Sequence, residues 1–149
     1  MDPLIDLDSV TVQRNGTPML TDVSWQVLPD ENWVILGHNG SGKTTLLRVA
    51  SLYLHPTRGT VRILGETWGR TDVRTLRARI GVASQALADQ LRGDLEAREV
   101  VMTGRYAALE PWWHTYTDAD RDKAHFELAR VGVDHLAERR FGTLSAGER

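Results

Sequence analysis

The sequence contains one segment whose residue types and spacing suit phosphate chemistry, GHNGSGKTT at residues 37–45. Gly37, Gly42, Lys43 and Thr44 fit the pattern G-x-x-x-x-G-K-[ST] without a gap. Glycines let backbone N–H groups converge on a phosphate chain without obstruction, and the N-terminus of a following helix adds partial positive charge. The lysine reaches the β- and γ-phosphates, and the threonine hydroxyl ligates Mg²⁺. The predicted phosphate-binding residues are Gly37, His38, Asn39, Gly40, Ser41, Gly42, Lys43, Thr44 and Thr45.

The residues on either side of this loop favour the same interpretation. The apolar run at 33–36, WVIL, predicts a parallel strand covered on both faces. Residues 43–54 carry apolar side chains near one face of a predicted helix. The alternative is a glycine-rich turn that binds nothing. A strand before the loop and a helix after it favour phosphate binding.

The other predicted elements divide the chain into a β-rich beginning and a helical second half. Residues 4–13 and 20–27 alternate as strands do, and Asn15-Gly16 between them is a hairpin signal. Helix-favouring segments follow, with Thr71 or Asp72 and the pair Thr117 and Asp120 as caps. Further strands are predicted at 60–64 and 80–84, and further helices at 71–80, 96–104 and 118–133.

Composition limits the classes of protein to consider. The chain has 149 residues, 41% of them hydrophobic, which suits one compact domain. The formal net charge of −2 provides no global basic field, so we expect no nucleic acid partner. Cysteine is absent, which excludes disulfides and thiolate metal sites. No signal peptide is visible, and no apolar run approaches the roughly 20 residues of a spanning helix.

Three motifs in order, GHNGSGKTTLL, then Ser84-Gln85 after a predicted strand, then LSAGER at 144–149, resemble the nucleotide-binding domain of ATP-binding cassette (ABC) transporters. The resemblance spans essentially the whole chain. A dipeptide or an LSAGE run alone is a weak signal, since Ser145 also suits a helix N-cap. Found together at these positions, the motifs are specific.

The resemblance implies roles for particular residues. Gln85 would contact Mg²⁺ together with Thr44 and position the attacking water. Ser145 and Gly147 would meet the γ-phosphate of ATP held by a second subunit. Arg14 stands where the family usually has an aromatic side chain that stacks on adenine; a guanidinium plane also stacks on rings, and the alternative is a solvated hairpin residue.

The resemblance also implies an architecture. We expect an α/β fold with a P-loop core built on a mostly parallel sheet, an N-terminal antiparallel β portion and a helical subdomain. The single, incomplete domain would divide into an antiparallel portion, the core, the helical subdomain and the signature, at residues 1–32, 33–85, 86–143 and 144–149.

The family places its Walker B strand, catalytic Glu and switch His after the signature, so the chain is expected to stop before them. Because two residues follow Gly147, we expect no helical turn to close there. Because the catalytic Glu and the switch His would be missing, we expect no ATP hydrolysis by these residues alone.

The expected function is that of an ATP-binding subunit, using ATP and Mg²⁺ to energise transport through a separate membrane-spanning protein. The resemblance implies a homo- or heterodimer, cytoplasmic and peripheral on the inner face of the cell membrane. Two alternatives stay open: a non-catalytic nucleotide-binding module, and another P-loop enzyme such as a small-molecule kinase.

Overall fold

The computed structural model describes residues 2–149, which form two compact units. The first unit ends at Arg77 and the second spans Ala78–Arg149. The boundary between them falls inside the predicted core segment 33–85. No helix among the described residues is long and apolar enough to cross a membrane.

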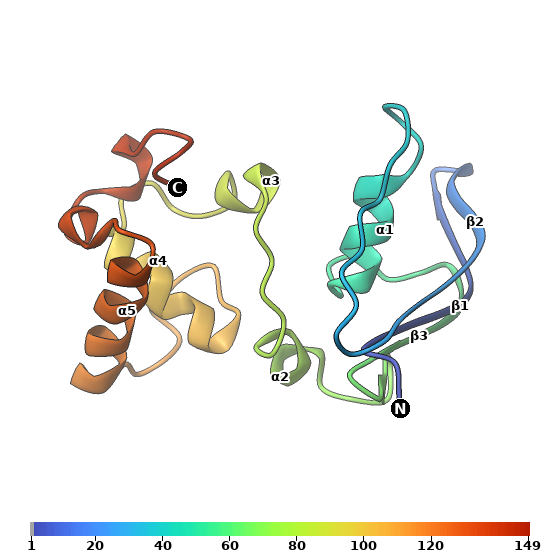
Figure 1. Ribbon diagram of the computed structural model, residues 1–149, viewed down its shortest axis with the longest axis horizontal. Helices are drawn as coiled ribbons and strands as arrows, with labels where there is room; N and C mark the ends of the chain where they lie inside the picture. The colour runs from blue at the N-terminus through green and yellow to red at the C-terminus, as the bar shows by residue number, and fades with distance from the viewer. Residues whose placement is uncertain (1) are drawn as a thin grey trace. The chain divides into compact units, whose positions relative to one another are not determined.

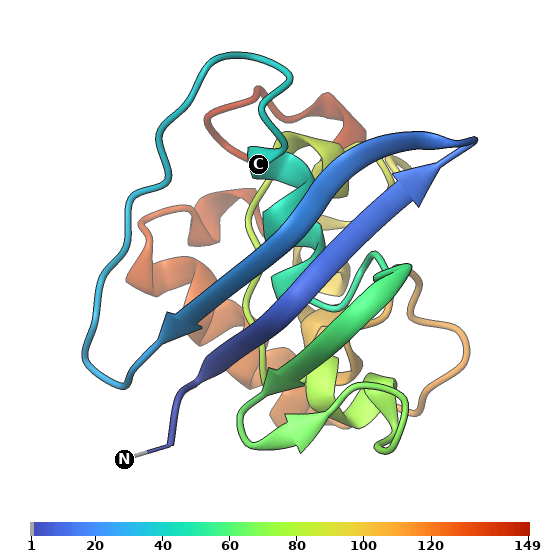
Figure 2. The ribbon, with the colours of Figure 1, turned by 90° about the vertical axis from the view of Figure 1, so that its right-hand side faces the viewer.

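The first unit contains a four-stranded sheet in the order β2-β1-β3-β4, seen face-on in Figure 2. The strands β1 (Ile5–Arg14) and β2 (Thr17–Val27) form the predicted hairpin, with Asn15 and Gly16 both at positive φ in the turn. The strand β3 (Arg58–Ile63) pairs with β1, and the short β4 (Glu66–Thr67) extends the sheet. The helix α1 (Lys43–Ala50) packs on the sheet (Figure 1).

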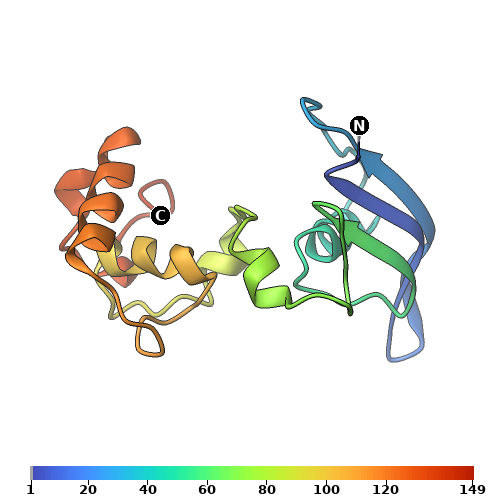
Figure 3. The same cartoon turned by 90° about the horizontal axis from the view of Figure 1, so that it is seen from below.

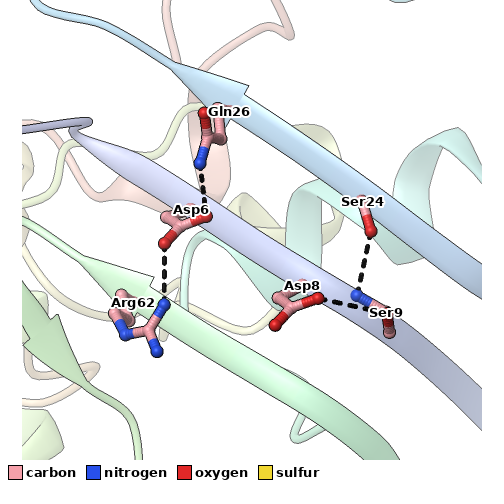
Figure 4. Close-up of polar contacts among 6 residues, drawn as sticks. All are labelled: Asp6, Asp8, Ser9, Ser24, Gln26 and Arg62. Carbon is pink, nitrogen blue, oxygen red and sulfur yellow. Dashed lines mark hydrogen bonds and ion pairs between the residues drawn. The ribbon is translucent and has the colours of Figure 1, made fainter.

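The predicted alternation along β1 is wrong at one point, where a β-bulge changes the buried face. Leu7, Val10 and Val12 are buried, so the inward face shifts between Leu7 and Val10. Ser9 accommodates the extra residue at φ +51°, and its N–H donates to Ser24 Oγ at 3.0 Å (Figure 4). Gly59 lies against the bulge, because a Cβ there would come within 2.6 Å of the Asp8 carbonyl oxygen.

A group of polar side chains crosses three neighbouring strands, β2, β1 and β3, on one face of the sheet (Figure 4). Asp6 on β1 accepts from Gln26 Nε2 of β2 at 3.0 Å and from Arg62 of β3 at 2.9 Å. The hydrogen bond from Gln26, with help from Arg62, holds the pKa of Asp6 below its ordinary value. Such cross-strand pairs fix the register of neighbouring strands.

The predicted parallel strand at 33–36 and the predicted strand at 80–84 are both wrong: neither segment is a strand among the described residues. All pairs between the strands of the sheet are antiparallel. An apolar run becomes a strand only where a neighbour pairs with its backbone, and within residues 2–149 no segment pairs with either run. Trp33 is instead fixed locally, since its indole N–H donates to Glu31 at 3.0 Å and its ring meets Trp25 edge-on.

The helix predicted over 43–54 ends earlier, at Ala50. Leu52 is fully buried and adopts φ +66°, which turns the chain out of the helix. Arg77, the last residue of α2 (Val73–Arg77), donates from Nε to the Leu52 carbonyl at 3.0 Å. A cation at the carbonyl end of a helix complements the helix dipole.

The second unit is helical, as predicted, with α4 (Ala97–Thr103) and α5 (Asp118–Arg130) packed together (Figure 3). The capping box of Thr117 and Asp120 is confirmed, and Arg105 pairs with the same carboxylate. The backbone N–H of Thr117 and these partners lower the pKa of Asp120. The shorter elements are α3 (Gln85–Ala88), η1 (Gly104–Tyr106), η2 (Asp134–Leu136) and η3 (Phe141–Thr143).

The exposed run at residues 33–36 predicts self-association. Val34 is 79% exposed and Leu36 87% exposed. Within residues 2–149, no strand is hydrogen-bonded to the backbone of this run. Unpaired apolar edges recruit further strands, so we expect concentration-dependent association and a marginally stable chain. Val34→Lys is expected to reduce association, measured by size-exclusion chromatography with light scattering.

Val131→Lys is the matched control, because Val131 is 73% exposed while its backbone N–H is bonded to Leu128. A monodisperse wild-type monomer that melts cooperatively above about 60 °C, the upper end for mesophile domains, would contradict the prediction.

Candidate functional site

The glycine loop forms a tight curve that ends in the first turn of α1. Gly40 and Gly42 adopt φ +82° and +90°, and Gly42 is the N-cap of the helix. The Leu46 N–H donates to the Gly42 carbonyl at 2.8 Å, which begins the helical ladder. A left-handed N-cap is accessible to glycine at little cost and strained for other residues.

Close packing as well as backbone angle requires glycine here. A Cβ on Gly42 would lie 2.8 Å from the Met19 carbonyl oxygen and 2.9 Å from Leu20 Cδ2, so β2 forms a wall against the loop. A Cβ on Gly37 would lie 2.6 Å from Ser41 Oγ. The loop therefore exposes backbone where side chains would otherwise stand. That is the property a phosphate chain needs.

The side chain of Lys43 closes the curve from inside. Its Nζ donates to the carbonyls of Gly37 and His38, both at 2.7 Å, and lies 3.4 Å from Ser41 Oγ. These contacts hold the ammonium at the centre of the predicted phosphate-binding loop. Thr44 is exposed beside it, whereas Thr45 is buried under the helix and faces the interior. Of the two threonines, Thr44 has the hydroxyl that is accessible to a metal ion.

The structure does not bring Arg14 to the loop through any hydrogen bond or ion pair among the described residues. Arg14 is the last residue of β1, paired across the hairpin with Thr17, and it is exposed. The residues of the hairpin that contact the loop are Met19 and Leu20. The role of Arg14 beside adenine stays a prediction.

The remaining predicted site residues lie in the second unit. Gln85 begins α3, whose cap is Ser84, with the Ser84 Oγ accepting from the Leu87 N–H at 3.2 Å. Gln85 Nε2 donates to Asp89 Oδ1 at 2.8 Å. Gln85 and Ala146 both line one cavity of about 340 Å³, which Leu91, Val100 and Phe141 also line. The second unit thus places Gln85 and the signature around a common cavity.

The expectation that no turn closes after Gly147 is wrong. The N–H groups of Glu148 and Arg149 both donate to the Ser145 carbonyl at 3.1 Å. The Glu148 carboxylate accepts the Ser145 N–H at 2.7 Å, and this bond holds the pKa of Glu148 below its ordinary value. The carboxylate three residues after a serine is a capping-box spacing, so two residues after Gly147 suffice to close the turn.

Two arginines that sequence reasoning missed bind the carbonyls before this turn. Arg149 donates to the carbonyls of Leu144 and Gly142, each at 3.0 Å, and Arg139 donates to that of Thr143 at 3.3 Å. Arg139 also lies 3.9 Å from the Glu148 carboxylate. Their sequence spacing gives no signal for these bonds, because which carbonyls an arginine reaches depends on the fold of residues 139–149.

Comparison with known proteins identifies the class. The family model described as ABC transporter matches residues 20–149. The chain belongs to this family, as the sequence motifs predicted.

Named relatives agree with that assignment. An uncharacterised ABC transporter ATP-binding protein, YlmA of Bacillus subtilis (strain 168), is 39% identical over 147 residues, covering 98% of this chain and 55% of the relative. A hemin import ATP-binding protein, HmuV of Bordetella bronchiseptica, is 37% identical over 143 residues, covering 94% and 51%. The chain spans about half the length of the curated relatives it matches.

Solved structures confirm the fold. The dimeric structure of MJ0796, a bacterial ABC transporter cassette, matches with a TM-score of 0.80 at 24% identity, covering 97% of this chain and 64% of that one. The ADP conformation of the cassette MJ1267 matches with a TM-score of 0.70 at 21% identity, covering 99% and 61%. At these identities the similarity concerns the fold, which is the P-loop fold of ABC cassettes.

The loop geometry predicts that Lys43→Ala abolishes binding of Mg·ATP. The ammonium at the centre of the curve is the charge placed to meet the β- and γ-phosphates. Titration with a fluorescent ATP analogue measures the loss. Lys123→Ala is the matched control, since Lys43 and Lys123 are the two lysines of the chain and Lys123 lies on α5. Equal affinity of wild type and Lys43→Ala would refute the prediction.

Proposed function

We propose that this protein is the ATP-binding subunit of an ABC transporter and binds Mg·ATP to energise transport through a separate membrane protein. The observation that carries the proposal is the closed glycine loop, with Lys43 inside it and α1 starting at its end. The fit of a triphosphate follows from the three glycines of the loop. At Gly42 a Cβ would collide with the Met19 carbonyl, at Gly37 it would displace the Ser41 hydroxyl, and Gly40 adopts a positive φ.

Each loop residue has a defined task in this proposal. Backbone N–H groups of residues 37–45 bind the phosphates, and Lys43 exchanges its carbonyl partners for the β- and γ-phosphate oxygens. Thr44 and Gln85 would hold the Mg²⁺, which offsets negative charge on the phosphates when bound. Arg14 would stack on the adenine ring. Preorganised charge around the transferred phosphoryl group is the main source of rate in phosphoryl transfer.

The partner surfaces follow from the second unit. Ser145 and Gly147 are exposed at the closed turn, where the Ser145 hydroxyl and the Gly147 N–H can meet a phosphate. We infer that they bind the γ-phosphate of ATP held by a second copy or a homologous subunit. The protein would then act as a head-to-tail dimer on the inner face of the cell membrane. An import system is favoured, since relatives include a hemin import protein.

The pairing is tested by ATP-dependent self-association in sedimentation velocity. Wild type with Mg·ATP is expected to gain a dimer beyond the concentration-dependent association that it shows without nucleotide. Ser145→Ala is expected to retain ATP binding and lose this dimer, whereas Lys43→Ala loses both. An ATP-dependent dimer that is unchanged in Ser145→Ala would contradict the assignment of the signature.

Turnover separates an ATPase from the second candidate, a nucleotide-binding module without catalysis. No run of four apolar residues followed by Asp occurs in the sequence, so the Walker B pattern is not among residues 1–149. We therefore expect these residues to bind Mg·ATP without releasing phosphate above background. A steady-state phosphate-release assay measures this, and sustained release that disappears in Lys43→Ala would overturn the expectation.

A further inference from the structure

Gly93 and Gly142 approach each other backbone to backbone just before the turn at residues 145–149, and we call this contact the clamp. A Cβ on Gly142 would lie 3.0 Å from both the Cα and the carbonyl oxygen of Gly93, and a Cβ on Gly93 would lie 3.1 Å from Gly142 Cα. Neither glycine has a positive φ. Space, and not backbone conformation, is therefore what requires glycine at both positions.

The contact belongs to a short ladder that joins the segment before α4 to the segment before the signature. The Gly142 N–H donates to the Gly93 carbonyl at 2.9 Å, and the Phe141 N–H donates to that of Leu95 at 2.8 Å. Further along, the Ala97 N–H donates to the Arg139 carbonyl at 2.9 Å. Because the atoms facing each added Cβ are backbone atoms held by these bonds, no flexible side chain can yield to it.

The clamp is connected to the signature by direct bonds. Leu144, two residues after Gly142, is buried in a cluster with Ala97, Leu136 and Phe141. Arg149 donates to the Gly142 carbonyl at 3.0 Å, so the end of the turn is tied back to the clamp. Leu144 precedes Ser145, and Arg149 follows Gly147. A shift of the Gly142 backbone is therefore passed to the chain on both sides of Ser145 and Gly147.

We propose that Gly93 and Gly142 are positioning residues for the signature, and that their contact sets where Ser145 and Gly147 present their donors. The proposal rests on the proposed function, in which these donors meet ATP on a second subunit. The two glycines bind no nucleotide themselves. They act by allowing the segments 93–97 and 139–142 to approach so closely that a Cβ at either position would push the facing backbone away.

Gly142→Ala and Gly93→Ala in the 149-residue chain test the clamp from both sides. Backbone amide NMR is expected to show displaced resonances and faster hydrogen exchange at Glu148 and Arg149, whose N–H groups close the turn on Ser145. Protection along α5 is expected to be unchanged. Gly104→Ala is the matched control, because Gly104 has φ −57° and a Cβ there meets no atom within 4 Å.

The functional test compares two equilibria in each variant, the binding of ATP and the ATP-dependent formation of the dimer. Binding of the ATP analogue by each variant is expected to match wild type, while the ATP-dependent dimer weakens at least several-fold. The positioning role would be overturned if the amides of Glu148 and Arg149 in the variants stay as in wild type. It would also be overturned if protection from exchange is lost along α4 and α5 as much as at these two amides. Should wild type form no ATP-dependent dimer, the proposed function fails, and the amide comparison still decides for or against the clamp.

Discussion

The first unit depends on the contact between Gly42 and β2. Gly42 has to start α1 in a left-handed conformation while its Cα faces the Met19 carbonyl and the Leu20 side chain. Leu20 is buried, so the contact fixes the end of the loop to the core of the unit. The loop can then curve around Lys43 although residues 33–36, which precede it, form no strand. The contact of Gly42 with β2 and the hydrogen bonds of the Lys43 ammonium therefore hold the curve that we propose binds phosphate.

Elements whose partners are close in sequence could be predicted from sequence, and elements with remote partners could not. The β1–β2 hairpin forms at Asn15-Gly16 because two residues supply both positive φ angles. The capping box at Thr117 succeeds for the same reason, since both its partners lie within three residues. Residues 33–36 show the opposite case: apolarity favours a parallel strand, but a strand exists only with a neighbour in the ladder.

The candidate site divides along the same line. The residue types of the glycine loop and its following helix could be read directly, because the motif encodes the chemistry of each position. The wall formed by Met19 and Leu20 could not, since it joins residues more than 20 positions apart. The bulge at Ser9 was also missed, because alternation is a local pattern and Gly59, which the bulge needs beside it, is remote.

Both units use the absence of a side chain for the same physical purpose. At Gly42 the missing Cβ lets a helix start lie against a strand, and at Gly142 it lets the base of the signature lie against the segment before α4. In each case the donors that we propose for phosphate follow within a few residues, at Lys43 and Thr44 in one unit and at Ser145 and Gly147 in the other. Preorganisation of donors needs a rigid base, and backbone-to-backbone contact leaves fewer rotamers to adjust than any side-chain contact. In our proposal Gly142 binds no phosphate and fixes the backbone whose donors do, whereas Gly42 belongs to the phosphate-binding loop itself and also fixes that loop against β2.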